Sequence, residues 1–307
     1  MPVRPDDEPL DQYLRRVGFS NAGLSYARRS WVNAAGEAID QLSAQVSLAE
    51  MRDESTGAGD YRILDGYDRA LAPLAADQAI RFNTVVTALA WDDHGVRVTA
   101  ADGQVFTADH AIITLPLGVL QSDAVRFTPD LPPEKRGALH ALRMGPALKL
   151  IYRFAAPIWP PGVMALYSPL NPPMWWTPSA GQPDAGQVIM AFATGDWARG
   201  LIALGEAGAL AQGLRVLADE LGRTPPPPLI ARWVNWAADP YACGGYSAAP
   251  PGAAAARQIL AQPLAGTLFW AGEATAPNIW AATVHGAYVS GQRAATEILS
   301  QCPHCES

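Results

Sequence analysis

Apolar positions recur along the chain with two different periods, and these periods predict its secondary structure. Near the C-terminus, four apolar residues from Leu268 lead into Gly272 and Glu273, a polar loop follows, and residues 282–299 carry apolar or small residues at helical spacing. We therefore expect a strand, a loop and a helix in that order. Glycine lets the backbone approach a bound group closely, a carboxylate accepts hydrogen bonds from hydroxyls, and a helix start presents unpaired N–H groups. This segment is typical of a ligand-binding site.

Helical spacing also dominates the first fifty residues. No group of catalytic residue types gathers there, so this part is expected to be a helical subdomain that packs on the rest. The glycines at 57–59 lack the third glycine and the preceding strand of a dinucleotide-binding loop. The predicted helices are 11–17 and 35–51, joined by a loop around Asn21, then 67–76, a short helix after Pro132, and 206–221.

Period-two patterns with β-branched residues predict the strands. Turn residues at 92–95 and 102–103 separate three such runs, which should form an antiparallel meander. The run 111–120 is continuously apolar, as expected for a strand buried on both faces. Residues 159–176, rich in Pro, Trp and Tyr, fit a substrate-cavity wall and an ordinary aromatic core equally well. The predicted strands are 80–91, 96–99, 104–107, 111–120, 145–154, 187–193 and 230–236.

Composition narrows the possible partners. The chain has 307 residues, 49% hydrophobic and 17% charged, and no apolar run long enough to span a bilayer. Its N-terminus lacks the apolar stretch of a signal peptide, so a cytoplasmic location is expected. The net charge of −7 argues against nucleic acid as the main partner, because phosphate binding needs a basic surface.

Cysteine and histidine offer little chemistry. Three cysteines do not make a disulfide framework, and the Cys302–Cys305 pair, despite its thiol-redox spacing, lies in what reads as a frayed tail. No metal-ligand cluster and no Ser-His-Asp arrangement appears.

Lysine is scarce, with only two residues, Lys135 and Lys149, among 22 lysines and arginines. A lysine kept against such a background suggests a site that needs a compact or deprotonatable amine. Lys135 reads as an exposed residue of a helix start. Lys149 instead alternates with apolar neighbours in a strand and is the better functional candidate.

The segment from Leu268 to Arg293, with its Gly-Glu pair and the run Ala-Thr-Val-His-Gly-Ala at 282–287, resembles the C-terminal flavin-contacting motif of the FAD-dependent amine oxidases. That family includes monoamine oxidases, polyamine oxidases and lysine-specific histone demethylases. The resemblance implies that Gly272 and Glu273 lie beside the ribityl and diphosphate of FAD. It also implies that the backbone at Thr283 and Val284 meets the pyrimidine edge of the isoalloxazine.

Further motifs agree with the same family. The run Trp236 to Ser247 is similar to its Trp-x-x-Asp-Pro-x-x-x-Gly-x-Tyr-Ser motif, which makes Tyr246 one wall of an aromatic cage, opposite Thr283. Lys149 matches the lysine that reaches the flavin N5 atom through a water. Val86 matches a position that offers backbone hydrogen bonds on the adenine side. Gly245 replaces the cysteine that carries FAD in monoamine oxidases, so the FAD would be non-covalent.

The resemblance implies an α/β (α+β) fold of two interleaved regions. One is an incomplete Rossmann-like FAD-binding domain with a β-meander, and the other is a substrate domain of mixed sheet plus helices. The expected segments are 1–76 (helical, substrate domain), 77–140 (FAD domain), 141–245 (substrate domain), 246–300 (C-terminal FAD-binding segment) and 301–307 (tail).

The implied reaction is amine oxidation: a hydride passes from the α-carbon to flavin N5, the imine hydrolyses, and O2 is reduced to H2O2. The family also opens with a βαβ unit carrying Gly-x-Gly-x-x-Gly, which this sequence lacks. Three explanations stay open: a separate N-terminal FAD-binding polypeptide, a truncated reading frame, or loss of FAD binding. The chain alone is expected to be colourless and inactive. Alternatives are an L-amino acid oxidase-like flavoenzyme and a non-catalytic remnant that only binds partners.

Overall fold

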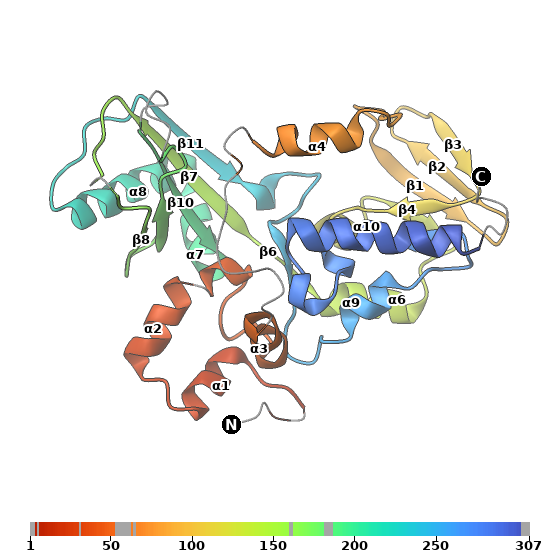
Figure 1. Ribbon diagram of the computed structural model, residues 1–307, viewed down its shortest axis with the longest axis horizontal. Coiled ribbons are helices and arrows are strands. Elements are labelled where there is room, and N and C mark those ends of the chain that lie inside the picture. Colours follow the sequence, from red (N-terminus) through yellow and green to blue (C-terminus); the bar gives the residue numbers. More distant parts are fainter. Residues whose placement is uncertain are drawn as a thin grey trace.

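The computed structural model of this chain describes residue 4 and residues 6–30, 32–52, 63, 66–159, 162–180 and 187–301. The glycines at 57–59 and the cysteines at 302 and 305 lie outside the described residues. Figure 1 shows two sheet-containing regions side by side, with the N-terminal helices below the place where they meet. One region contains the β-meander and the C-terminal helix, and the other contains the long-stranded sheet.

A five-stranded antiparallel sheet has the order β11-β7-β10-β9-β8. Side chains of β7 alternate across it: Leu148 and Tyr152 are buried against the helices α7 and α8, whereas Lys149 lies partly buried on the opposite face. The strands predicted at 145–154, 187–193 and 230–236 and the helix at 206–221 are thereby confirmed. The bounds are β7 Ala147–Phe154, β8 Ala165–Tyr167, β9 Met174–Trp176, β10 Gln187–Thr194, β11 Ile230–Asn235, α7 Gly195–Ile202 and α8 Gly205–Leu221.

A second sheet, of order β3-β2-β1-β5, contains the predicted antiparallel meander. β5 joins it in parallel with β1. The first strand begins at Val86 and not at residue 80, because Asn83 takes a left-handed backbone conformation (φ +55°) that interrupts the extended run. The bounds are β1 Val86–Trp91, β2 Val96–Ala100, β3 Val105–Ala108 and β5 Arg126–Thr128.

Two short strand pairs hold the C-terminal segment: β4 with β13 in parallel, and β6 with β12 in antiparallel. The prediction of a strand buried on both faces over 111–120 is wrong, since Ile112 is 41% exposed and the strand stops before Pro116. Proline cannot donate to a strand ladder and instead precedes a helix here. The bounds are β4 Ala111–Ile113, α5 Leu117–Gln121, β6 Arg143–Gly145, β12 Tyr246–Ala248 and β13 Leu268–Trp270.

The strand, loop and helix predicted at 268–299 are confirmed, because α10 (Val284–Leu299) follows β13 after two short 3-10 turns. These turns are η4 (Glu273–Thr275) and η5 (Asn278–Trp280). The helix α9 (Ala256–Ala261) lies between β12 and β13 in the sequence.

The N-terminal helices differ from the prediction in two places. The expected loop around Asn21 is a helix, α2, whose start is capped by the Ser20 hydroxyl accepting from Gly23 N (3.1 Å). The expected helix 35–51 begins only after Ser43, because Gly36 has φ +87° and Ser43 Oγ accepts from Val46 N (3.0 Å). The bounds are α1 Leu10–Arg16, α2 Asn21–Arg29, η1 Asn33–Ala35, α3 Ala44–Arg52, α4 Tyr67–Ala75 and α6 Pro133–Ala141.

The core beneath the meander combines residues from distant parts of the sequence, such as Leu89 of β1, Leu139 of α6 and Trp270 of β13. Lys135 joins this core and is only 2% exposed, so its prediction as an exposed residue is wrong. Its ammonium donates to the carbonyls of Leu260 (2.9 Å) and Gln262 and lies 4.5 Å from the centroid of the Trp270 ring.

No single described helix is both long and apolar enough to cross a membrane. The helices α7 and α8 meet that composition test only as a pair bent by 117°, and both pack on the five-stranded sheet.

Candidate functional site

Tyr246 opens β12, where its backbone pairs with Gly145 of β6. Its hydroxyl donates to the carbonyl of Ala34 (2.6 Å), and its ring lies against Gly36 so closely that a Cβ there would be 2.8 Å from the ring atom Cε2. Burial, and then the negative charges of Glu50 and Glu273, raise the pKa of the phenol. The Tyr246 side chain is therefore uncharged, and it is fixed by its backbone pairing with Gly145 and by the hydrogen bond of its hydroxyl.

Lys149 stands on the partly buried face of the five-stranded sheet, opposite Phe192 of β10 and Val234 of β11. Its Nζ atom is 5.9 Å from the centroid of the Phe192 ring, which itself makes an edge contact with Trp176 (5.9 Å between centroids). Burial lowers the pKa of this amine. An amine on an apolar, aromatic wall can hold a water or a polar group away from bulk solvent.

The start of β7 lies against the chain just before Tyr246. A Cβ at Gly245 would lie 2.4 Å from the Cβ of Ala147, so the chain before Tyr246 presses directly on that strand. Ala147 is two residues before Lys149, and alternate residues of a strand point to the same face. The backbone of Gly245 thus packs on the sheet face that carries Lys149.

The C-terminal motif contributes a helix start. Thr283 caps α10: its hydroxyl accepts from Gly286 N (3.0 Å) and donates to the carbonyl of Trp280 (2.6 Å). Val284, the first helical residue, is 54% exposed. Helix geometry leaves the first backbone N–H groups without intrahelical partners, so they can bind a carbonyl or an anion. The Thr283 hydroxyl is already used by the cap.

Gly272 and Glu273 are occupied by internal partners. Gly272 has φ +109°, which favours glycine, and its N–H donates to Ser290 Oγ (2.8 Å). The Glu273 carboxylate accepts from Ser247 N (3.0 Å), from Ser247 Oγ (2.5 Å) and from Ala282 N (2.9 Å). Glu273 joins β12 to the loop before α10.

Val86 lies away from the residues described so far, and Arg257 was not expected among them. Val86 starts β1 and packs against the core beneath the meander, and no interaction described here links it to Tyr246 or Lys149. Sequence reasoning missed Arg257 of α9, which contacts both Ser247 and Glu273. The residues around it are small and apolar, so nothing in the local pattern indicated a buried guanidinium.

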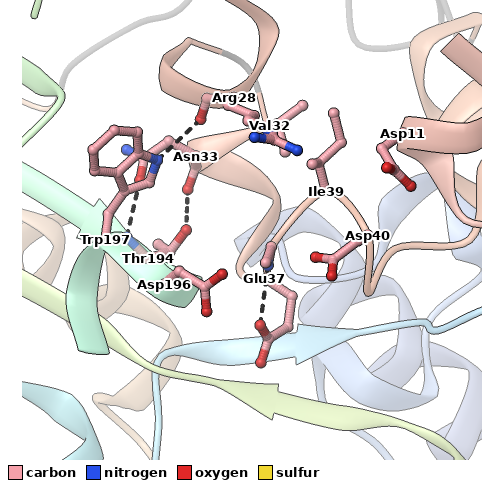
Figure 2. A pocket seen from close by; sticks show the side chains of 11 residues that line it. Asp11, Arg28, Val32, Asn33, Glu37, Ile39, Asp40, Thr194, Asp196 and Trp197 are labelled. Atoms are coloured by element: carbon pink, nitrogen blue, oxygen red, sulfur yellow. Dashed lines mark hydrogen bonds between the residues drawn. The ribbon is translucent and has the colours of Figure 1, made fainter. Parts of the chain in front are cut away.

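A pocket of about 370 Å³ lies between the N-terminal helices and the start of α7 (Figure 2). Residues on both sides of Gly36 in the sequence line it. Sequence reasoning missed it, because its lining comes from segments more than 150 residues apart. Asn33 ties these segments together by accepting from Thr194 N (2.9 Å) and donating to the Phe192 carbonyl (3.1 Å). The acidic side chains around it are Asp11, Glu37, Asp40 and Asp196, and Arg28 is the basic one.

The geometry can be compared with known proteins. The family model for flavin-containing amine oxidoreductases matches residues 3–299. The chain belongs to this family. The predicted resemblance is thereby confirmed, and the α/β character of the fold agrees with it.

Amine oxidoreductases of two kinds are similar in sequence. The lysine-specific histone demethylase 1 homolog 2 of Oryza sativa subsp. japonica is 30% identical over 304 residues, which covers 95% of this chain and 37% of the relative. Polyamine oxidase 4 of the same organism is 31% identical over 260 residues, covering 82% of this chain and 52% of the relative. This chain spans about a third to a half of these curated relatives.

Solved structures of amine oxidases are similar to this chain in fold. Putrescine oxidase bound to putrescine has a TM-score of 0.81 at 18% identity, covering 96% of this chain and 68% of that one. Cyclohexylamine oxidase from Brevibacterium oxydans IH-35A has a TM-score of 0.79 at 17% identity, with 97% and 68% covered. At this identity the match shows a shared fold.

This amine oxidoreductase chain fits one end of FAD. The apolar surface beside Lys149, the Tyr246 ring and the start of α10, where helix geometry leaves the first N–H groups without intrahelical partners, each have chemistry that suits part of a flat ring with a polar edge. At the Gly-Glu pair the Gly272 N–H already donates to Ser290 Oγ and is not free for a diphosphate, and the Glu273 carboxylate can only accept hydrogen bonds, as it does from Ser247 and Ala282.

Proposed function

We propose that this chain forms the substrate side and the ring-binding side of an FAD-dependent amine oxidase. The observation that supports the proposal is the close contact of Gly245, the residue before Tyr246, with Ala147, which shares a sheet face with Lys149. When bound, FAD would supply the chemistry of amine oxidation, that is, acceptance of a hydride from the α-carbon and return of the electrons to O2 as H2O2. The imine product then hydrolyses.

The residues of the chain bind and orient the reactants. The Tyr246 ring holds an amine through its π face and excludes water from the reacting carbon. Lys149 holds a water with its amine, which burial keeps easy to deprotonate. The backbone at Thr283 and Val284 receives the carbonyl edge of the ring at the start of α10.

We further propose that an N-terminal FAD-binding polypeptide, not included in these 307 residues, completes the FAD domain. The strands β4 and β13 form a two-stranded parallel pair, whereas parallel sheets normally have more strands and are covered on both faces. A βαβ unit beside this pair would add the missing strands and the phosphate-binding loop, making a Rossmann-like sheet.

The test is to compare the chain alone, mixed with FAD, with a fusion in which the N-terminal FAD-binding segment of a family relative precedes the chain. We expect the chain alone to stay colourless and the fusion to show flavin absorbance and to release peroxide with an amine. Lys149→Met in the fusion should lower peroxide release by at least about tenfold and keep the flavin, since it removes one positioned group.

Two outcomes would contradict the proposal. A yellow fusion that releases no peroxide with polyamines, monoamines or amino acids would favour a binding-only role. A yellow chain alone would refute the need for a completing segment. Turnover of amino acids but not of polyamines would favour an L-amino acid oxidase-like activity over a polyamine oxidase.

A further inference from the structure

Arg257 is a buried arginine, 3% exposed, at the start of α9. Its guanidinium holds the residue that follows the cage tyrosine: Nη1 donates to Ser247 Oγ (2.6 Å) and Nη2 donates to the Ser247 carbonyl (3.1 Å). The same Nη1 atom lies 3.9 Å from Glu273 Oε2. The Arg257 side chain therefore hydrogen-bonds to both the backbone and the hydroxyl of Ser247.

The Glu273 carboxylate also binds Ser247. It accepts from the N–H and the hydroxyl of Ser247 and, through Oε2, from Ala282 N. Ser247 directly follows Tyr246, and Ala282 directly precedes Thr283. The two halves of the expected cage are thus fixed to a single carboxylate, whose partner is Arg257.

Stability alone does not account for this arrangement. A buried ion pair loses its hydration, and apolar side chains of similar volume often stabilise a fold as well or better. Burial lowers the pKa of the Arg257 guanidinium, and the charges of Glu273 and Glu50 oppose that shift. Among the described residues the Nε atom finds no partner. What the pair does provide is directional bonds to two backbone segments.

We propose that Arg257 is a positioning residue, which fixes Tyr246 relative to Thr283 and Val284 through Ser247 and Glu273. Its importance for catalysis rests on the proposed oxidase function. Its effect on Tyr246 does not, and it can be measured in the chain without FAD.

The experiment measures nitration of Tyr246 by tetranitromethane, followed by mass spectrometry of the peptides. This reagent attacks the phenolate, which the raised pKa of Tyr246 makes scarce. Tyr152, fully buried in the other core, serves as the internal reference for global unfolding. We expect Arg257→Met to raise nitration at Tyr246 about tenfold, as for the loss of a charge-assisted hydrogen bond, with Tyr152 unchanged. Arg257→Lys should restore part of the protection.

Arg293→Met is the matched control. Arg293 of α10 is also an arginine bonded to carbonyls, those of Thr275 (2.9 Å) and Trp270, but it does not contact Ser247. The Arg293→Met variant should have a lower thermal unfolding midpoint but unchanged nitration at Tyr246. If Arg257→Met does not fold, Ser247→Ala removes the hydroxyl from the network and should raise nitration at Tyr246 by a smaller factor.

Unchanged nitration in Arg257→Met, or in Ser247→Ala where that variant replaces it, would overturn the proposal. So would an equal rise at Tyr246 in Arg293→Met, because Arg257 would then act only through overall stability. In the flavin-containing fusion, Arg257→Met should lower kcat more than it raises KM. A fusion without oxidase activity would refute the proposed function, and the nitration result would still decide the role of Arg257.

Discussion

At the scale of single residues, the two lysines show how burial changes a side chain that sequence treats as simply charged. Both have lowered pKa values because they lie away from water. Lys149 was proposed as a functional residue from its apolar neighbours in a strand and from the scarcity of lysine, and its role stays a prediction. Lys135 was misassigned because the sequence of its helix, with Pro133, Glu134 and Arg136, has a polar start, and the covering helix α9 is more than a hundred residues away.

Lys135 should make the stability of the chain depend on pH. Burial lowers its pKa to about 7, although the two carbonyls and the Trp270 ring favour the ammonium form. In the unfolded chain the pKa is about 10.4. Between these values the unfolded state binds more protons, so the free energy of unfolding should rise with pH from about 7 to 10.

Urea unfolding at several pH values checks this expectation. Lys135→Met should flatten the rise, which amounts to a few kcal/mol at most by the usual conversion of pKa differences. Arg136→Met, a change at the exposed neighbour that pairs with Asp130, should keep it. An identical slope in Lys135→Met would show that Lys135 is not its source.

At the scale of elements, the start of α10 is capped by Thr283 and is also part of the proposed ring site. The apolar spacing placed this helix within two residues of its true start, which the structure shows to be capped by Thr283. The sequence did not show that Gly272 and Glu273 form hydrogen bonds within the protein that link separate elements. Their partners, Ser290 and Ser247, come from other elements.

Removing the cap should weaken α10. Thr283→Ala loses the acceptor for Gly286 N and should lower the free energy of unfolding by about 1 kcal/mol, as for other N-caps. Thr283→Ser keeps the hydroxyl and should retain most of that stability. Thr296→Ala, which removes a hydroxyl within the same helix, should change it by less. Equal losses in Thr283→Ala and Thr296→Ala in urea unfolding would contradict the capping role.

At the scale of the whole molecule, apolar side chains remain exposed near the parallel strand pair. Ile112 of β4 is 41% exposed, and Val284 and Tyr288 of α10 are 54% and 53% exposed. The helix α4 has no buried residue, although Tyr67, Leu71 and Leu74 are apolar. Such exposure marks surface that another polypeptide can cover.

The chain alone should therefore bind the dye ANS, and the fusion to an FAD-binding segment should bind less. Replacing both Val284 and Tyr288 with serine should reduce dye fluorescence in the chain alone and have little effect in the fusion, where these side chains are covered. Equal fluorescence in the chain and the fusion would indicate that the added segment does not dock on this surface.

The sequence by itself determined the local structure and the family. Periodicity located the meander, the long strands of the five-stranded sheet and α10, because these elements follow from backbone geometry and burial on one face. It failed where a single backbone conformation decides, as at Asn83, Gly36 and Pro116. Those residues end or start elements against the apolar pattern around them.

Only the tertiary structure decided which side chains share an environment. Arg257, Ser247 and Glu273 meet because β12 and α9 pack beside the loop before α10, and Lys135 is buried because α9 covers α6. Hydrogen bonds and desolvation act between groups that are close in space, and the spacing of residues along the chain does not encode that closeness. For this reason the motif residues could be predicted, but their partners could not.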